Sequence, residues 1–104
     1  MYLIFDTETT GLPKKKKAPF EPISNWPRLV QLAWIVCDCR GGIISKENRI
    51  IAPDNFEVPI EVAKIHGIST ERARREGVPL VIVLHDFLCA SRSAKFLVAH
   101  NRFT

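Results

Sequence analysis

Apolar runs of strand length dominate the first half of the chain. An apolar run at residues 2–5 leads into Asp6 and Glu8, and residues 28–38 form a long β-rich run that is apolar on both faces. Residues 39–42 predict a hairpin turn, because Gly41 and Gly42 tolerate the positive φ that tight primed turns need. Residues 43–51 then pair back as a third strand, whose polar middle is typical of an exposed edge. These segments predict a three-stranded antiparallel meander with the acidic strand on its inner side.

The second half of the chain has helical periodicity. Residues 60–66 predict a short helix with Pro59 at its first helical position and Gly67 as its stop. A second short helix follows at residues 71–75, capped by Ser69 and ended by Gly77.

A third helix, opened by Pro79, carries an apolar stripe with the spacing of a helix packed on a sheet. The stripe consists of Leu80, Val83, Leu84, Phe87 and Leu88. His85 and Asp86 fall off it, so His85 is expected at the surface rather than as a ligand. A wholly apolar segment at residues 96–99 predicts a short, buried fourth strand.

The order of these elements indicates a single α/β domain with a ribonuclease H-like mixed sheet. The 104 residues suffice for one core. Between the first two strands, residues 13–27 contain four prolines and a run of four lysines at 14–17, and they predict a surface loop.

Composition and charge narrow the function classes only slightly. Hydrophobic residues make up 46% of the chain and charged residues 25%, as in ordinary folded proteins. The net charge of +4 is compatible with a polyanionic partner, and the lysine run is either a phosphate-binding element or a solvated loop. No apolar stretch is long enough to span a membrane, and the strand-like start leaves no room for a signal peptide, so the cytosol is expected. The three cysteines, Cys37, Cys39 and Cys89, are expected to be small buried hydrophobes.

The candidate chemistry lies in the first strand. Alternate residues of a strand share a face, so Asp6 and Glu8 point the same way, about 7 Å apart along the chain. Two neighbouring carboxylates repel each other unless a divalent cation lies between them, and oxygen ligands suit Mg²⁺ or Mn²⁺. The alternative is that both are solvated loop or capping residues.

The longer pattern carries a family resemblance. The apolar strand followed by Asp-Thr-Glu-Thr-Thr-Gly-Leu at residues 6–12 closely resembles the first motif of the DEDD 3′–5′ exonucleases, the superfamily of the proofreading epsilon subunit of bacterial DNA polymerase III. Residues 28–33 resemble the second strand of that family, residues 64–68 its segment beside the terminal nucleotide, and residues 97–101 the start of its second motif.

The resemblance implies two-metal hydrolysis of phosphodiester bonds, with Mg²⁺ or Mn²⁺ as the two cofactor ions. Asp6 and Glu8 would be the catalytic metal ligands. The residues implied to bind the terminal nucleotide and its backbone are Thr7, Thr9, Thr10, Gly11, Leu12, His66, Ile68 and Asn101. The alternative for His66 is a helix-end residue that complements the helix dipole. The implied partners are a single-stranded DNA 3′ end, RNA as the alternative, and a DNA polymerase.

The sequence also departs from the family pattern. The second motif continues His-Asn-x-x-Phe-Asp, whereas residues 100–104 read His-Asn-Arg-Phe-Thr, and the residues of the third motif are not among the 104. We therefore expect residues 1–104 to be the N-terminal portion of an exonuclease domain, weak or inactive alone and prone to self-association through an uncovered sheet. The alternatives are a non-catalytic nucleic-acid-binding remnant and a structural module.

Overall fold

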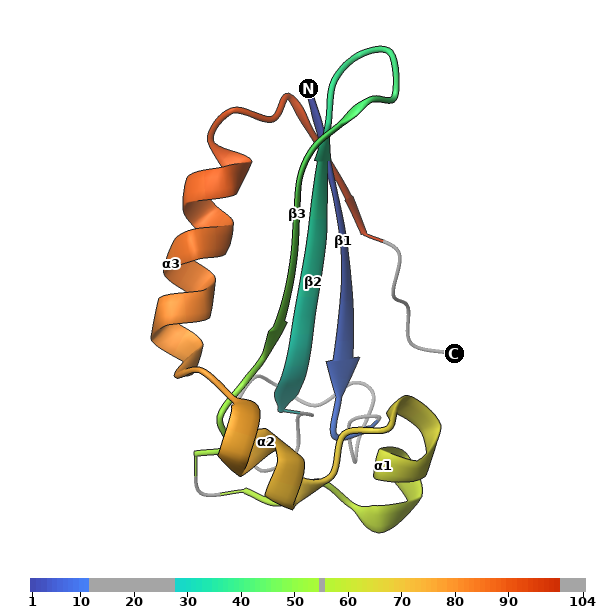
Figure 1. Cartoon of the computed structure of the whole chain (residues 1–104), viewed down its shortest axis with the longest axis vertical. Coiled ribbons are helices and arrows are strands. Elements are labelled where there is room, and N and C mark those ends of the chain that lie inside the picture. The colour runs from blue at the N-terminus through green and yellow to red at the C-terminus, as the bar shows by residue number, and fades with distance from the viewer. Residues whose placement is uncertain (12–27, 55, 100–104) are drawn as a thin grey trace, which may run out of the picture.

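In the computed structural model, residues 1–11, 28–54 and 56–99 are described. Four strands form one mixed sheet in the order β3-β2-β1-β4 (Figure 1). The strands are β1 (Tyr2–Thr9), β2 (Leu29–Cys37), β3 (Ile43–Ile50) and β4 (Phe96–Ala99). The pairs β1–β2 and β2–β3 are antiparallel, while β4 runs parallel to β1. The predicted meander is confirmed, and the acidic strand β1 lies inside the sheet. The lysine run, Leu12 and Asn101 lie outside the described residues.

The predicted hairpin turn between β2 and β3 is confirmed, with one of its two glycines at positive φ. The amide of Asp38 donates to the carbonyl of Gly42 at 2.9 Å, and only Gly41 of the two glycines has positive φ, at 84°. At Gly42 an added Cβ would lie 2.8 Å from an oxygen of the Asp38 carboxylate, so this side chain would have to shift. The other oxygen of this carboxylate accepts hydrogen bonds from the amides of Arg40 and Gly42, which holds it inside the turn.

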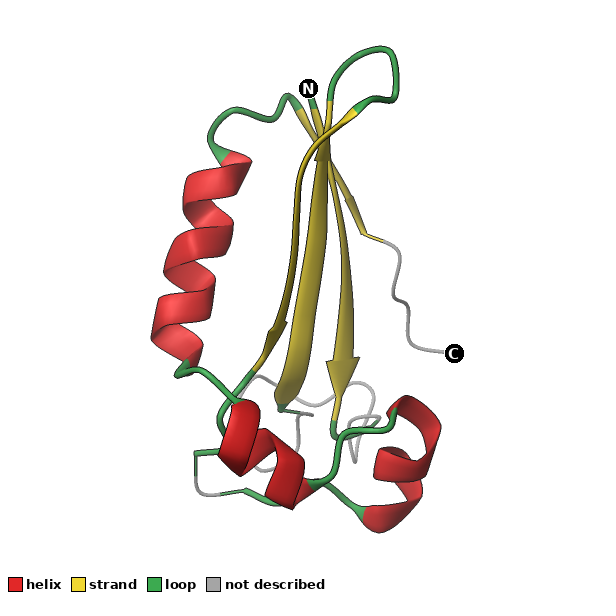
Figure 2. Ribbon diagram, viewed as in Figure 1, coloured by secondary structure: helices red, strands yellow, loops and turns green. Residues whose placement is uncertain are grey.

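Three helices follow the meander along the chain. They are drawn in red in Figure 2. They are α1 (Ile60–His66), α2 (Thr70–Glu76) and α3 (Leu80–Ser91). Pro59 is the N-cap of α1 rather than its first helical residue, which corrects the prediction by one position. The predicted stop at Gly67 is confirmed by its φ of 77°, and the predicted cap at Ser69 is confirmed because its Oγ accepts a hydrogen bond from the amide of Arg72.

Helix α3 packs on one face of the sheet through a narrower surface than its sequence predicted. Val83 is fully buried, and the ring of Phe87 lies edge-on to those of Phe5 and Trp34, with centroids 5.3 and 5.5 Å away. The prediction that the whole stripe packs on the sheet is wrong for the three leucines at 80, 84 and 88, which are 39%, 40% and 60% exposed. The helix is turned so that Asp86, predicted off the stripe, reaches Arg49 of β3 at 2.8 Å.

A second core cluster lies at the end of the sheet where β1 finishes. Its buried residues are Val30 of β2, Val58, Ile68 and Ala73 of α2, and Val62 and Ala63 of α1 pack against them. Thr70 strengthens this junction, since its hydroxyl accepts a hydrogen bond from the amide of Val58 at 2.8 Å. As a result, α1 lies beside the end of β1 (Figure 1).

Two burial predictions are wrong. Strand β4 is exposed along its whole length, with Phe96, Leu97 and Val98 between 45% and 57% exposed, because it pairs only with β1 and the described residues place no helix on it. Cys39 and Cys89 are exposed and Cys37 is half-buried, so the cysteines are not core residues. Self-association through this apolar surface stays a prediction. Among the described residues, no helix has the length and apolar character to cross a membrane.

Candidate active site

Asp6 and Glu8 lie on one face of β1, as predicted. Asp6 is opposite Ala33 and Glu8 is opposite Gln31 in the antiparallel pairing with β2, and both acids are partly buried. Residues opposite each other across two strands share a face of the sheet. The acids therefore share the face that carries Ile4, whereas α3 packs on the other face, against Leu3 and Phe5.

The register of β1 on β2 shifts immediately after the acid pair. Glu8 pairs with Gln31 but Thr9 pairs with Leu29, so Val30 is an extra residue on β2. Such bulges bend a strand and re-aim its side chains, and they are frequent next to active sites. Here the extra residue lies on β2, opposite the step from Glu8 to Thr9.

The threonines at residues 9 and 10 shape this strand end. The Thr10 hydroxyl accepts a hydrogen bond from the amide of Arg28 at 2.9 Å, while the Thr10 amide donates to the Arg28 carbonyl at 3.0 Å. The Thr9 hydroxyl donates to the carbonyl of Gly11 at 3.2 Å. Gly11 has a φ of 132°, which favours glycine, and a Cβ built on it would lie 3.7 Å from Val62 of α1. The turn after the acid pair is thus held both to β2 and near α1.

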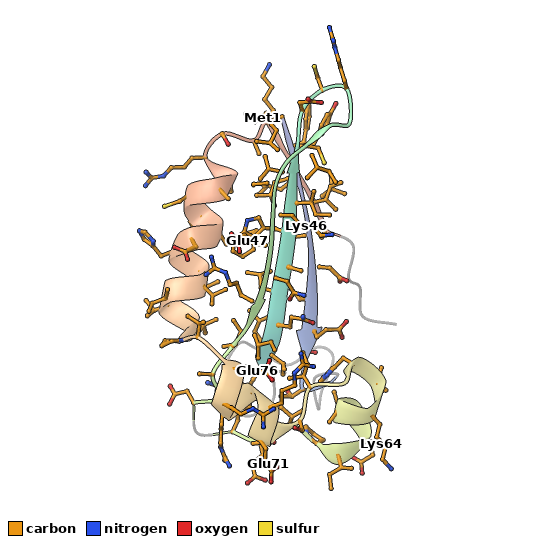
Figure 3. All side chains as sticks on the ribbon, in the orientation of Figure 1. Met1, Lys46, Glu47, Lys64, Glu71 and Glu76 are labelled. Atoms are coloured by element: carbon orange, nitrogen blue, oxygen red, sulfur yellow. The ribbon has the colours of Figure 1, made fainter. Side chains whose placement is uncertain are left out.

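A shallow depression of about 250 Å³ lies over the acid-bearing face, lined by Asp6, Ala33, Lys46 and Asn48 among others. Lys46 and Asn48 come from β3, opposite Ile35 and Ala33, and so share this face of the sheet. Figure 3 shows the side chain of Lys46 pointing away from α3, whereas that of Glu47 lies on the α3 side.

Sequence reasoning missed Lys46, Asn48 and Gln31 as members of this surface. The side-chain amide nitrogen Nε2 of Gln31 donates to the side-chain oxygen Oδ1 of Asn48 at 2.5 Å, which joins β2 and β3 beside the acids. The signal was available in the alternation of residues 46 and 48 along the third strand, once its register with β2 is known.

The structure does not place the side chains of Thr7 and Ile68 beside the acid pair. Thr7 lies between the acids but its side chain faces the opposite side of the sheet, beside Phe5, so only its backbone can meet a nucleotide bound over the acids. Ile68 is 2% exposed and belongs to the second core cluster, so the prediction that its side chain meets a base is not supported by its position. We assign Ile68 to the fold.

His66 has an unusual environment at the end of α1. Its Nδ1 accepts a hydrogen bond from the amide of Ile68 at 3.1 Å, and its Nε2 is buried without a hydrogen-bond partner among the described residues. Because Nδ1 is an acceptor, Nε2 carries the proton of the neutral ring and is a donor. A buried donor without a partner costs free energy until a partner arrives, which is consistent with a ligand-binding role for His66.

The described groups whose pKa clearly departs from its ordinary value lie on the α3 side of the sheet, away from the acid pair. The hydrogen bond from Arg49, followed by that from His85, lowers the pKa of Asp86. The same bond to Asp86, followed by that to Glu47, raises the pKa of Arg49. Arg49 also lies over the ring of Trp34, 5.7 Å from its centroid, so this cluster fastens α3 to β3.

The acid pair fits a hard divalent cation in donor type, because carboxylate oxygens are the ligands that Mg²⁺ and Mn²⁺ prefer. It is incomplete in number. Nowhere in the described ranges do three or more histidine, cysteine, aspartate or glutamate side chains come together as a metal site. Asp6 and Glu8 therefore fit as part of a cation site rather than as a whole one.

Comparison with known proteins identifies the class. The model of the exonuclease family of the RNase T type matches residues 3–104, and the chain belongs to this family, within the DEDD superfamily. A search of curated proteins returned no match.

Solved structures agree on the fold. Exonuclease I matches with a TM-score of 0.74 and 21% identity over 96% of this chain. A structure titled SSB/Exonuclease I with an inhibitor matches with a TM-score of 0.75 and 23% identity over 98%. E. coli exonuclease I with a dT13 oligonucleotide matches with a TM-score of 0.74 and 22% identity over 96%. The chain spans only 20% to 22% of the length of these proteins, so the likeness concerns the ribonuclease H-like fold of one part of them.

Proposed function

We propose that this chain contributes the first acidic motif of a metal-dependent 3′–5′ exonuclease that hydrolyses phosphodiester bonds at nucleic-acid 3′ ends. The observation that supports this most strongly is the position of Asp6 and Glu8, on one face of an inner strand and directly before a bulge. The family assignment over residues 3–104 supports the reaction class.

In this proposal Asp6 and Glu8 hold two Mg²⁺ or Mn²⁺ ions together with carboxylates that are not among the described residues. The bound ions would supply charge stabilisation at the scissile phosphate and lower the pKa of an attacking water. The chain's own contribution is placement, since the Thr10–Arg28 hydrogen bonds fix where β1 ends. Gly11 has no side chain, so a nucleotide can approach the backbone closely at this position.

His66 keeps the role that the family resemblance implies, a contact to the terminal nucleotide. Leu12 and Asn101, which lie outside the described residues, keep the roles that the family resemblance implies: an apolar contact to the last base and a contact to the substrate backbone. The substrate that we favour is single-stranded DNA, because two related structures are titled as complexes of E. coli exonuclease I with thymidine oligonucleotides. RNA as a substrate and association with a polymerase remain open proposals.

Residues 1–104 alone are expected to be a weak enzyme. Two carboxylates bind two cations poorly, and no general base for the water is assigned among these residues. Each factor of ten in rate corresponds to about 1.4 kcal/mol of barrier, so loss of a ligand and of the base together lowers the rate by several orders of magnitude. The alternative, a non-catalytic nucleic-acid-binding protein, predicts binding without any cleavage.

The test uses 5′-labelled single-stranded DNA with the protein in excess, in Mn²⁺ and in EDTA. We expect slow, metal-dependent shortening from the 3′ end that is lost in Asp6→Asn and in Glu8→Gln. Glu71→Gln is the matched control, because Glu71 is exposed and lies at the start of α2, not on β1 (Figure 3). Salt-sensitive binding with no shortening would support the non-catalytic alternative, and products that start from the 5′ end would contradict the proposal.

A further inference from the structure

The outer surface of α3 carries a pair of metal-binding side chains that the proposed exonuclease site does not use. His85 and Cys89 are one helical turn apart, and the Nε2 atom of His85 lies 3.8 Å from the Sγ atom of Cys89. Both are open to solvent, the His85 side chain being 74% exposed. They lie on the side of the sheet opposite to Asp6 and Glu8, and they are therefore independent of that site.

Asp86 orients the His85 ring through the second ring nitrogen, Nδ1. Its Nδ1 lies 3.4 Å from Oδ1 of Asp86, and a carboxylate can only accept a hydrogen bond, so Nδ1 carries the proton. The second oxygen of Asp86 accepts a hydrogen bond from Arg49 of β3 at 2.8 Å. The sheet thus anchors the carboxylate, the carboxylate orients the imidazole, and the unprotonated Nε2 faces the thiol.

The separation of the two donor atoms matches the requirement of a tetrahedral ion. Zinc bonds of about 2.3 Å to sulfur and about 2.05 Å to nitrogen, at a tetrahedral angle, place the two donors about 3.6 Å apart. The structure has them 3.8 Å apart, close to this separation. A carboxylate on the remote ring nitrogen is the usual outer partner of a histidine that binds zinc, and it orients the ring and makes it a better ligand.

We propose that His85 Nε2 and Cys89 Sγ form a two-ligand chelate for Zn²⁺ or a similar soft divalent ion, with Asp86 as its outer partner. Binding replaces the thiol proton by the metal, and the proton leaves to solvent. Water completes the coordination, because both oxygens of Asp86 are engaged by His85 and Arg49. With two protein ligands the affinity falls below that of four-ligand structural zinc sites.

The chain offers an internal control. Cys39 is also exposed, but it lies in the β2–β3 turn and has no hydrogen bond to a histidine in the described part of the chain. A chelate at Cys89 predicts that its thiol binds metal much more tightly than the thiol of Cys39.

The experiment compares a protein whose only thiol is Cys89 (Cys37→Ala, Cys39→Ala) with one whose only thiol is Cys39 (Cys37→Ala, Cys89→Ala). Each is titrated with Cd²⁺, and the ultraviolet thiolate-to-Cd²⁺ charge-transfer absorption is followed, with Zn²⁺ as competitor. Carboxylates give no such band, so Cd²⁺ at Asp6 and Glu8 does not contribute. Far-UV circular dichroism checks that α3 remains folded in every variant.

We expect half-saturation at a Cd²⁺ concentration at least tenfold lower for the Cys89 protein. His85→Gln should abolish that difference, and Asp86→Asn should weaken binding by about tenfold, the usual effect of removing an outer partner. Equal half-saturation for the two thiols would overturn the proposal. So would undiminished binding in folded His85→Gln, because the thiol would then bind without the imidazole.

Discussion

Two glycines that flank α2 should respond very differently to the same substitution. At Gly77, φ is −74°, which suits any residue, but an added Cβ would lie 2.5 Å from the Ala52 nitrogen, 2.6 Å from its Cα and closer still to the Ala73 carbonyl oxygen. At Gly67, φ is 77°, but an added Cβ would meet nothing within 4 Å. The first substitution tests packing, and the second tests backbone strain alone.

The expected loss of unfolding free energy depends on whether the atoms around each glycine can shift. All three atoms around Gly77 belong to backbone that is fixed by hydrogen bonds, among them Ala52 N–H to the Val78 carbonyl at 2.9 Å. Overpacking of this kind costs about 3 kcal/mol or more of unfolding free energy when the neighbours cannot yield. At Gly67 the cost is the left-handed conformation of an alanine, about 1 kcal/mol. Gly77→Ala should therefore be at least about 2 kcal/mol worse than Gly67→Ala.

Urea unfolding, followed by far-UV circular dichroism, measures the difference. With a slope of about 1.5 kcal/mol per molar urea, Gly67→Ala lowers the midpoint by about 0.7 M and Gly77→Ala by about 2 M, to the point of incomplete folding. Gly77→Ser should resemble Gly77→Ala, because the clash comes from Cβ. If Gly67→Ala proved as destabilising as Gly77→Ala, the steric argument would be refuted.

Three further predictions concern stability and binding. The bond to Arg49 lowers the pKa of Asp86 in the folded protein, so the stability that it adds is present above the ordinary aspartate pKa and is lost as the pH falls through the lowered value. Asp86→Asn should therefore reduce the loss of stability at acid pH, measured as urea midpoints against pH. An unchanged profile would exclude this ion pair as a source of stability. Val83→Ala removes two fully buried methyl groups between α3 and the sheet and should lower the free energy of unfolding by about 2 kcal/mol. Val81 is 73% exposed, so Val81→Ala should lower it by less than about 0.5 kcal/mol. Equal effects would contradict the packing of α3. Replacing the four lysines at 14–17 by glutamine should weaken the binding of single-stranded DNA, measured by fluorescence anisotropy. The slope of log K against log salt concentration should become shallower by about 0.7 for each phosphate that a lysine had neutralised. An unchanged slope would mean that this run is only a solvated loop.

The sequence predicts the parts of this fold that depend on local periodicity. Alternation in the first strand placed Asp6 and Glu8 on one face, and Gly67 and Ser69 marked helix ends correctly, because caps and strand faces are decided by a few neighbouring residues. The burial of β4 was mispredicted, since burial depends on which element covers a strand and not on the strand itself.

Other errors have the same physical origin. The sequence predicts too many α3 residues in contact with the sheet, because periodicity does not fix the rotation of a helix about its axis. The contact of Asp86 with Arg49, 37 residues away, helps to fix this rotation. Lys46 and Asn48 were missed because their place beside the acid pair follows from the register of β3 on β2, which composition does not specify.

Locating the divalent cation tests the role of the acid pair without relying on turnover. Backbone amide signals of the ¹⁵N-labelled protein are followed by NMR during a titration with Mn²⁺, whose unpaired electrons broaden nearby signals. If Asp6 and Glu8 hold the cation, residues 6–8 and the facing residues 31–33 broaden first, and Asp6→Asn with Glu8→Gln removes this effect while Glu71→Gln does not. First broadening elsewhere on the chain, or unchanged broadening in the double variant, would contradict the assignment of Asp6 and Glu8 as the cation-binding acids of an exonuclease site.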